Sequence, residues 1–291
     1  MREILTYGND EQITLALTFL IELVSLGGKD ISTALLSDTT VIRDLVFAQT
    51  EQLREKAACL FGTIASESPS PESAIRFLLR FGEGSVEKQH GGVSAVGTLL
   101  ARLAIQGRLF VLSRETLDKF GNDLATIIVS PNSNTMLLEA SLHSLSEICI
   151  FGGGLIFSVS HRDRIIARLK ALSKSTRNGR LQDQAVLSLG YISFSLTLPD
   201  DAPIFDRILE ALYNVHEQKQ IELLFSAGQA LSCVGARWTS KAMIRFRHAG
   251  IELLQEPLRG ILDHILNRIL EDVNSPKHPL RKVSPYIAIF T

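Results

Sequence analysis

Apolar residues along this chain recur at steps of three and four positions, with charged residues between them. In one such segment Phe205, Ile208, Leu209 and Leu212 stand at offsets 0, 3, 4 and 7. This is the period of an α-helix with one buried face, whereas a half-buried strand would alternate at every second residue. The pattern predicts helices at Glu72–Phe81, Thr116–Val129, Arg162–Leu172, Ile204–Asn214 and Pro257–Glu271.

A second kind of helix carries alanine, serine or glycine at recurring positions. Equivalent alanines lie 38, 45, 45 and 42 residues apart, at Ala57, Ala95, Ala140, Ala185 and Ala227. Repeats of about 40–47 residues are typical of the HEAT/armadillo class, while tetratricopeptide and ankyrin units have about 34 and 33 residues. The predicted fold class is therefore all-α, an α-solenoid of HEAT/armadillo-like antiparallel helix pairs.

The small residues have a physical cause. Stacked helices approach to about 8–10 Å, and a closer approach requires small side chains at the contact. We expect the five equivalent alanines to be buried, together with one leucine from each copy of the helix. These leucines are Leu60, Leu99, Leu145, Leu189 and Leu231.

A repeat array needs no domain boundary. We expect residues 1–271 to form one continuous HEAT-repeat solenoid of about five to six repeats. Residues 272–291 are expected to be a truncated or irregular C-terminal segment, because Pro285 falls where another helix would continue and proline removes a helical hydrogen bond. On this interpretation the sequence is part of something longer.

The composition argues against several classes of protein. Hydrophobic residues make up 45% of the chain, which argues against disorder, and the formal net charge of −1 provides no global attraction for nucleic acid or anionic lipid. The uncharged apolar stretches considered, Leu124–Val129 and Leu155–Val159, are far shorter than the roughly 18 residues that span a bilayer. We expect no membrane insertion. With no secretory signal recognised, the expected location is the cytoplasm and nucleus.

The sequence contains few candidates for catalytic or metal-binding residues. Cys59, Cys149 and Cys233 are widely separated, which favours buried, reduced thiols over a disulfide framework or a zinc site. Ser85 and Lys88 match a Ser-x-x-Lys pattern without its companion motifs, and an N-cap serine with a solvated lysine is enough to explain it. No histidine has a second histidine or a cysteine at i+3 or i+4. We predict no catalytic residues, no cofactor, no metal site and no small-molecule substrate.

Two basic stretches are the candidate binding surface. They could dock to an acidic protein surface or nucleic acid, or they could form the solvated outer face that any solenoid needs. No aromatic residues interleave with them as in a nucleic-acid stacking platform, so we expect no nucleic-acid partner. The candidate residues are Arg162, Arg164, Arg168, Lys170, Lys174, Arg177 and Arg180 in the first stretch, and Arg237, Lys241 and Arg245 in the second.

The segment Ile221–Ala242, with Phe225, Trp238 and Lys241, resembles the large HEAT-repeat proteasome adaptor and scaffold family. Arg54–Gly62 is similar to an earlier repeat of that family, and the likeness covers most of Arg54–Lys282. The resemblance implies a non-enzymatic scaffold that binds the proteasome, links its core and regulatory particles, and supports assembly and quality control. An importin-β-like nuclear transport receptor, or another protein-binding solenoid, is the alternative.

Overall fold

The structure is a computed structural model that describes residues 2–36, 39–81, 84–150, 156–174, 178–196, 201–217 and 221–238. It divides into two compact units, residues 1–161 and 162–291. All regular elements in the described ranges are helical. The α-helices are α1 (Arg2–Tyr7), α2 (Asp10–Leu35), α3 (Thr39–Leu45), α4 (Glu51–Ser66), α5 (Pro71–Phe81), α6 (Val86–Ile105), α7 (Arg114–Val129), α8 (Thr135–Ile150), α9 (Val159–Ser173), α10 (Gly179–Ile192), α11 (Ala202–Glu217) and α12 (Ile221–Trp238).

Four of the five helices predicted from apolar spacing are confirmed. They correspond to α5, α7, α9 and α11, and each begins one to three residues earlier than predicted. The missed residues at these starts are mostly polar or include proline, so they lack the apolar repeat that reveals the rest of each helix. The fifth predicted helix, Pro257–Glu271, lies outside the described residues, as does the predicted irregular segment 272–291.

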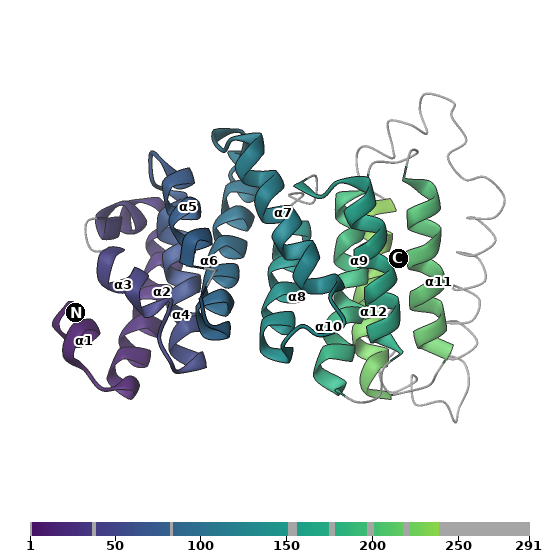
Figure 1. Ribbon diagram of the computed structural model, residues 1–291, viewed down its shortest axis with the longest axis horizontal. Coiled ribbons are helices and arrows are strands. Elements are labelled where there is room, and N and C mark those ends of the chain that lie inside the picture. The colour runs from purple at the N-terminus through teal and green to yellow at the C-terminus, as the bar shows by residue number, and fades with distance from the viewer. Residues whose placement is uncertain are drawn as a thin grey trace. The chain divides into compact units, whose positions relative to one another are not determined.

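The alanine-containing helices of the first unit form a row in which α2 packs on α4, α4 on α6, and α6 on α8 (Figure 1). Each is also paired with the helix before it, as α5 is with α6 and α7 with α8. In the second unit α12 packs on both α10 and α11. These stacked helix pairs confirm the predicted α-solenoid class, and continuity of the array over residues 1–271 stays a prediction.

The predicted core positions are buried. Ala57, Ala95, Ala185 and Ala227 are fully enclosed, and the five predicted leucines are also in the core. The three cysteines lie in α4, α8 and α12 as free thiols. Cys149 is buried, while Cys59 and Cys233 are half-buried, and burial raises the pKa of the Cys233 thiol to about 11.

Glycines mark the closest contacts between neighbouring helices of a row. A β-carbon on Gly62 of α4 would lie 2.7 Å from the carbonyl oxygen of Ala95 on α6. One on Gly97 would overlap the side chain of Ser144 on α8, and one on Gly190 would overlap the Cα of Ala230 on α12. The spacing between helices is therefore set at positions where no side chain fits.

Helix α2 differs from expectation. Among the described residues it is the helix long and apolar enough to cross a membrane by length and composition, with a mean hydropathy of 1.3 and 28% of that window buried. Sequence analysis overlooked it because Glu22 interrupts an apolar run that otherwise extends from Ile13 to Gly28. In the structure α2 starts at a capping box formed by Asn9 and Gln12, packs on α4, and is kinked at Gly28, where φ is 57°. The expectation of no membrane insertion stays a prediction.

We predict that Gly190→Ala destabilises the second unit by about 1–3 kcal/mol, because the added methyl group must displace the backbone of α12. Urea unfolding followed by circular dichroism measures the change. Gly179→Ala is the matched control in the same helix, since no atom lies within 4 Å of the position of its β-carbon. That variant should keep or gain up to about 1 kcal/mol of stability. Equal stability of the two variants would contradict the close-contact account.

Candidate protein-binding site

Polar side chains connect neighbouring repeats, and the residues they join are about one repeat apart in sequence. Thr50 donates to a carboxylate oxygen of Asp10, 40 residues away, at 2.5 Å. In the second unit Gln229 donates to the hydroxyl oxygen of Tyr191, 38 residues away, at 2.7 Å. We call these contacts the inter-repeat hydrogen bonds. Their separations match the spacing of the alanines, which shows that the repeat read in the sequence is also the repeat of the structure.

Glu72, near the start of α5, is a centre of such contacts. Its Oε1 accepts hydrogen bonds from Ser113 Oγ at 2.5 Å and Thr116 Oγ1 at 2.7 Å, both from the next repeat, and from Arg76 at 2.8 Å. Because these bonds favour the ionised carboxylate, above all the one from Ser113, they lower the pKa of Glu72 to about 2.

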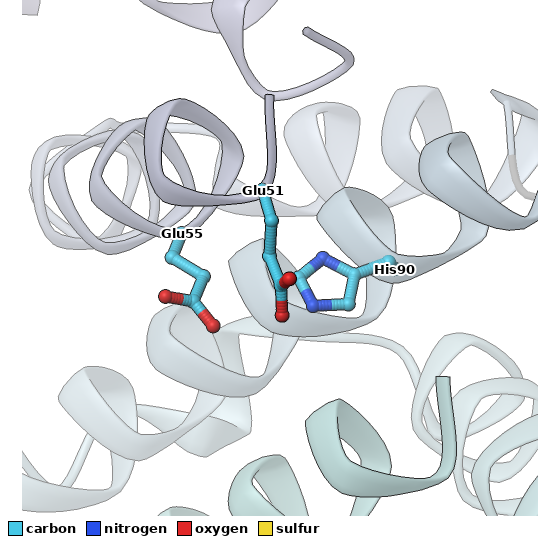
Figure 2. A group of neighbouring side chains, drawn as sticks. All are labelled: Glu51, Glu55 and His90. Atoms are coloured by element: carbon cyan, nitrogen blue, oxygen red, sulfur yellow. The ribbon is translucent and has the colours of Figure 1, made fainter. Parts of the chain in front are cut away.

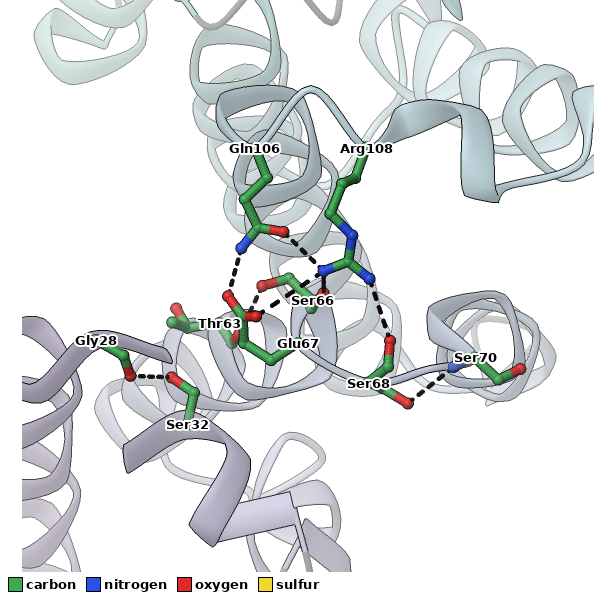
Figure 3. A network of polar contacts seen from close by, with 9 residues as sticks. All are labelled: Gly28, Ser32, Thr63, Ser66, Glu67, Ser68, Ser70, Gln106 and Arg108. Atoms are coloured by element: carbon green, nitrogen blue, oxygen red, sulfur yellow. Dashed lines mark hydrogen bonds and ion pairs between the residues drawn. The ribbon is translucent and has the colours of Figure 1, made fainter. Parts of the chain in front are cut away.

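Arg108 connects the turn after α6 to the end of α4 through hydrogen bonds (Figure 3). Its Nη1 donates to the carbonyl oxygen of Ser66 at 2.9 Å and to the side chain of Gln106 at 3.0 Å. Gln106 in turn donates to Glu67, and the guanidinium group lies within ion-pair range of the same carboxylate. Helix-end carbonyls that have no partner within their own helix are thus satisfied by the following repeat.

The structure places the first basic stretch mainly on α9, where two of its cations are already paired. Arg162 is buried and forms a 2.7 Å ion pair with Asp201, with 9% of each side chain exposed. Lys170 pairs with Glu210 of α11 at 3.1 Å. Arg162 therefore contributes no positive charge to the solvent-facing surface, which corrects the predicted set. The prediction failed because the acidic partner of Arg162 is 39 residues away in the sequence.

The remaining cations differ in their surroundings. Arg164 and Lys174 are exposed, and within the described part of the chain they form no ion pair; Arg180 is also exposed, at the start of α10. Arg168 is half-buried, with its Nε enclosed and not hydrogen-bonded. Arg237 lies in the last turn of α12, while Arg177, Lys241 and Arg245 are outside the described residues. Partner binding by this surface stays a prediction.

One polar cluster was missed by sequence analysis. Glu51 and Glu55 of α4 and His90 of α6 bring their oxygen and nitrogen atoms within 4.8 Å of one another (Figure 2). The two glutamates are exposed and the histidine is buried. A search for carboxylates four residues apart would have found the pair on α4, but His90 joins it only through the stacking of α6 on α4.

The cluster fits a hydrogen-bond network better than a metal centre. Arg54 is buried beside it, donating to Nδ1 of His90 at 3.5 Å and to the carbonyl oxygens of Ala48 and Gln49 at 2.9 and 2.5 Å. Burial, followed by the nearby Arg54 charge, lowers the pKa of His90 and keeps its ring neutral. A neutral imidazole that accepts at Nδ1 carries its proton on Nε2, which leaves no lone pair there for a metal.

The Ser85–Lys88 pattern has a structural explanation. Ser85 occupies the N-cap position of α6, and its hydroxyl group hydrogen-bonds to Glu87, whose pKa it lowers. Lys88 is exposed. The hydroxyl group is therefore engaged by Glu87 at the start of a helix, which is an ordinary arrangement for a serine at an N-cap position.

The stacked helix pairs define a HEAT/ARM-like repeat protein, and comparison with known families agrees. The family described as "ECM29, ARM-like repeats" matches residues 13–108. The chain is 24% identical over 245 residues to the human proteasome adapter and scaffold protein ECM29, covering 77% of this chain, and 25% identical over 191 residues to the Saccharomyces cerevisiae proteasome component ECM29, covering 64%. The resemblance to the proteasome adaptor and scaffold family is thereby confirmed.

The chain spans 13% and 10% of the lengths of these two relatives. Among solved structures, an engineered protein 17% identical to this chain aligns with a TM-score of 0.45, over 81% of this chain and 95% of that one.

We predict that Asp201→Asn lowers the free energy of unfolding by about 3–5 kcal/mol, because it leaves the buried Arg162 charge without its counter-ion. Asp163→Asn is the matched control, since the Asp163–Arg207 pair is more than 40% exposed on both sides and should be worth at most about 1 kcal/mol. Denaturant titration of both variants decides the point. Similar losses of unfolding free energy in the two variants would contradict the claim that burial makes the Arg162–Asp201 pair the more important one.

We also predict a contribution from Glu72 that depends on pH. Its pKa is about 2 in the folded chain against 4.5 for the free group, so the unfolded chain binds the proton more readily. Stabilisation by the ionised carboxylate is complete above pH 4.5 and is lost as the pH falls toward 2. The difference in urea midpoint between the wild type and Glu72→Gln should shrink over this range. The matched control is Glu115→Gln, which changes an exposed acid in the first turn of α7.

Proposed function

We propose that this chain is part of a non-enzymatic HEAT-repeat scaffold that binds the proteasome, links its core and regulatory particles, and supports their assembly and quality control. The observation that carries the proposal is the similarity to two relatives whose names state a proteasome role, over 77% and 64% of this chain. The proposed partners are core and regulatory particle subunits, and the proposed location is the cytoplasm and nucleus.

The fold supports a role in binding over one in catalysis. Its polar side chains are engaged in holding repeats together, as Glu72, Arg108 and Arg162 illustrate. Stacked helix pairs present broad surfaces, while catalysis and small-molecule binding favour concave pockets with a few convergent polar groups. The groups that remain available for a partner lie on the outside of the stack.

Within that function, we propose the exposed cations of the first basic stretch as a docking surface for acidic proteins. Arg164 and Lys174 are its best-supported members, because they are exposed and are not neutralised by α11 as Lys170 is. A surface charge of this kind acts mainly on association rate and on partner choice, and its effect weakens as salt is added.

The test is affinity capture of proteasome subunits by the tagged 291-residue chain under gentle conditions with ATP. We expect core and regulatory particle subunits to be recovered, and a double reversal, Arg164→Glu with Lys174→Glu, to reduce recovery several-fold. Lys88→Glu, an exposed lysine on α6, is the matched control and should leave recovery unchanged.

Failure to recover subunits with either the wild type or the control would overturn the proposed function for this chain. Equal recovery with all three proteins would retain proteasome binding and reject the basic surface. Partner binding that depends on a small GTPase would instead support the importin-β-like alternative.

A further inference from the structure

The turn between α4 and α5 contains two consecutive Ser-Pro dipeptides, Ser68-Pro69 and Ser70-Pro71. A third dipeptide, Ser130-Pro131, follows directly after α7. Proline biases the backbone of the preceding residue toward an extended conformation. An extended serine followed by proline is the substrate that proline-directed protein kinases accept. These are the three Ser-Pro dipeptides of the described residues, and two more, at Ser275 and Ser284, lie outside them.

Accessibility distinguishes the three serines. Ser70 is exposed, whereas Ser68 and Ser130 are half-buried. The Oγ of Ser68 accepts a hydrogen bond from the backbone N–H of Ser70 at 3.2 Å, and Ser68 lines a pocket together with Phe61 and Phe77. Within the part of the chain that the structure describes, the Ser70 hydroxyl group forms no hydrogen bond, and Ser70 joins the polar network through its N–H (Figure 3). Ser70 is therefore the serine whose hydroxyl oxygen is available to react.

The surroundings of Ser70 accommodate a phosphate group. Ser70 immediately precedes α5, and the partial positive charge at a helix N-terminus favours a phosphate group. Two acids lie in or beside the same turn, and each already has a basic partner. Glu67 lies 3.9 Å from Arg108, and Glu72 pairs with Arg76 at 2.8 Å. These partners reduce the repulsion that the two carboxylates would exert on a phosphate group.

We propose that Ser70 is a phosphorylation site for a proline-directed protein kinase, with ATP as the phosphoryl donor. The Oγ of Ser70 attacks the γ-phosphorus of ATP, and the new oxygen–phosphorus bond forms as the bond to the β,γ-bridging oxygen breaks. The hydroxyl proton passes to the catalytic aspartate of the kinase, and the products are phosphoserine and ADP. The modification gives this turn an added charge of about −1.5 to −2 at pH 7. The proposal does not depend on proteasome binding.

Phosphorylation in vitro tests the proposal. The polypeptide as its gene encodes it is treated with a phosphatase and then with a purified mitogen-activated protein kinase and ATP, and fragment mass spectra locate the phosphate. Synthetic peptides of residues 64–76 and 124–136 are treated in parallel, because they contain Ser70 and Ser130 without the fold. We expect the ratio of Ser70 to Ser130 phosphorylation to be on the order of tenfold higher in the folded polypeptide than in the peptides, since Ser130 must first become accessible by local opening.

Three variants of the polypeptide sharpen the test. Ser70→Ala should remove most of the phosphate from residues 64–76, and Ser130→Ala is the matched control that should leave it unchanged. Pro71→Ala keeps the serine and removes the proline that the kinase recognises, so it should also lose the phosphate. Circular dichroism checks that each variant is folded.

Phosphate mainly on Ser68 or Ser130, an equal ratio in the polypeptide and the peptides, or no phosphate on Ser70 would each overturn the proposal. Full phosphorylation of Pro71→Ala would also overturn it, because the kinase would then not be reading the proline. Thermal unfolding supplies a further measurement. The midpoint of the phosphorylated polypeptide should not fall below that of the untreated one, because the modified side chain is exposed and precedes a helix.

Discussion

The close approach of neighbouring helices at Gly62, Gly97 and Gly190 is the constraint on which the rest of this structure depends. Where a glycine faces the backbone of the next helix, only one spacing and one register satisfy both helices. The alanines and leucines at the other repeated positions then fill the space that this spacing leaves. A larger side chain at the contact would move two helices at once, because packed interiors have few voids to absorb it.

Polar contacts depend on that spacing in turn. The hydrogen bonds of Glu72 with Ser113 and Thr116 close only because the repeats are held at a fixed distance and without axial slip. An ordinary hydrogen bond adds only about 0.5–1.5 kcal/mol to stability, but leaving a buried partner unsatisfied costs more. These bonds therefore discriminate against a shifted register more than they drive folding. The Arg162–Asp201 pair imposes the same requirement in the second unit, with both charges enclosed.

Features encoded within one helix could be predicted from the sequence, and features that join two repeats could not. The apolar steps around Ile208 and the small residue at Ala185 are local signals, and both led to the observed structure. Arg162 was interpreted as a surface cation because its neighbours in sequence are basic, whereas its partner Asp201 lies one repeat further on. Searching for opposite charges one period apart would have found this pair and Lys170–Glu210. His90 offered no such signal. Its neighbours belong to α4, and as an uncharged hydrogen-bond acceptor it has no residue of opposite charge for which a sequence search could look.

The inter-repeat hydrogen bonds have a consequence for how such a chain folds. Each joins residues about 40 positions apart, as Thr50 and Asp10 are, and a stack of any length would add only more contacts of the same range. Loop closure therefore costs the same at every interface, and relative contact order falls as repeats are added. Each helix pair can form as soon as its neighbour has formed, so folding can follow synthesis along the chain without waiting for a distant segment.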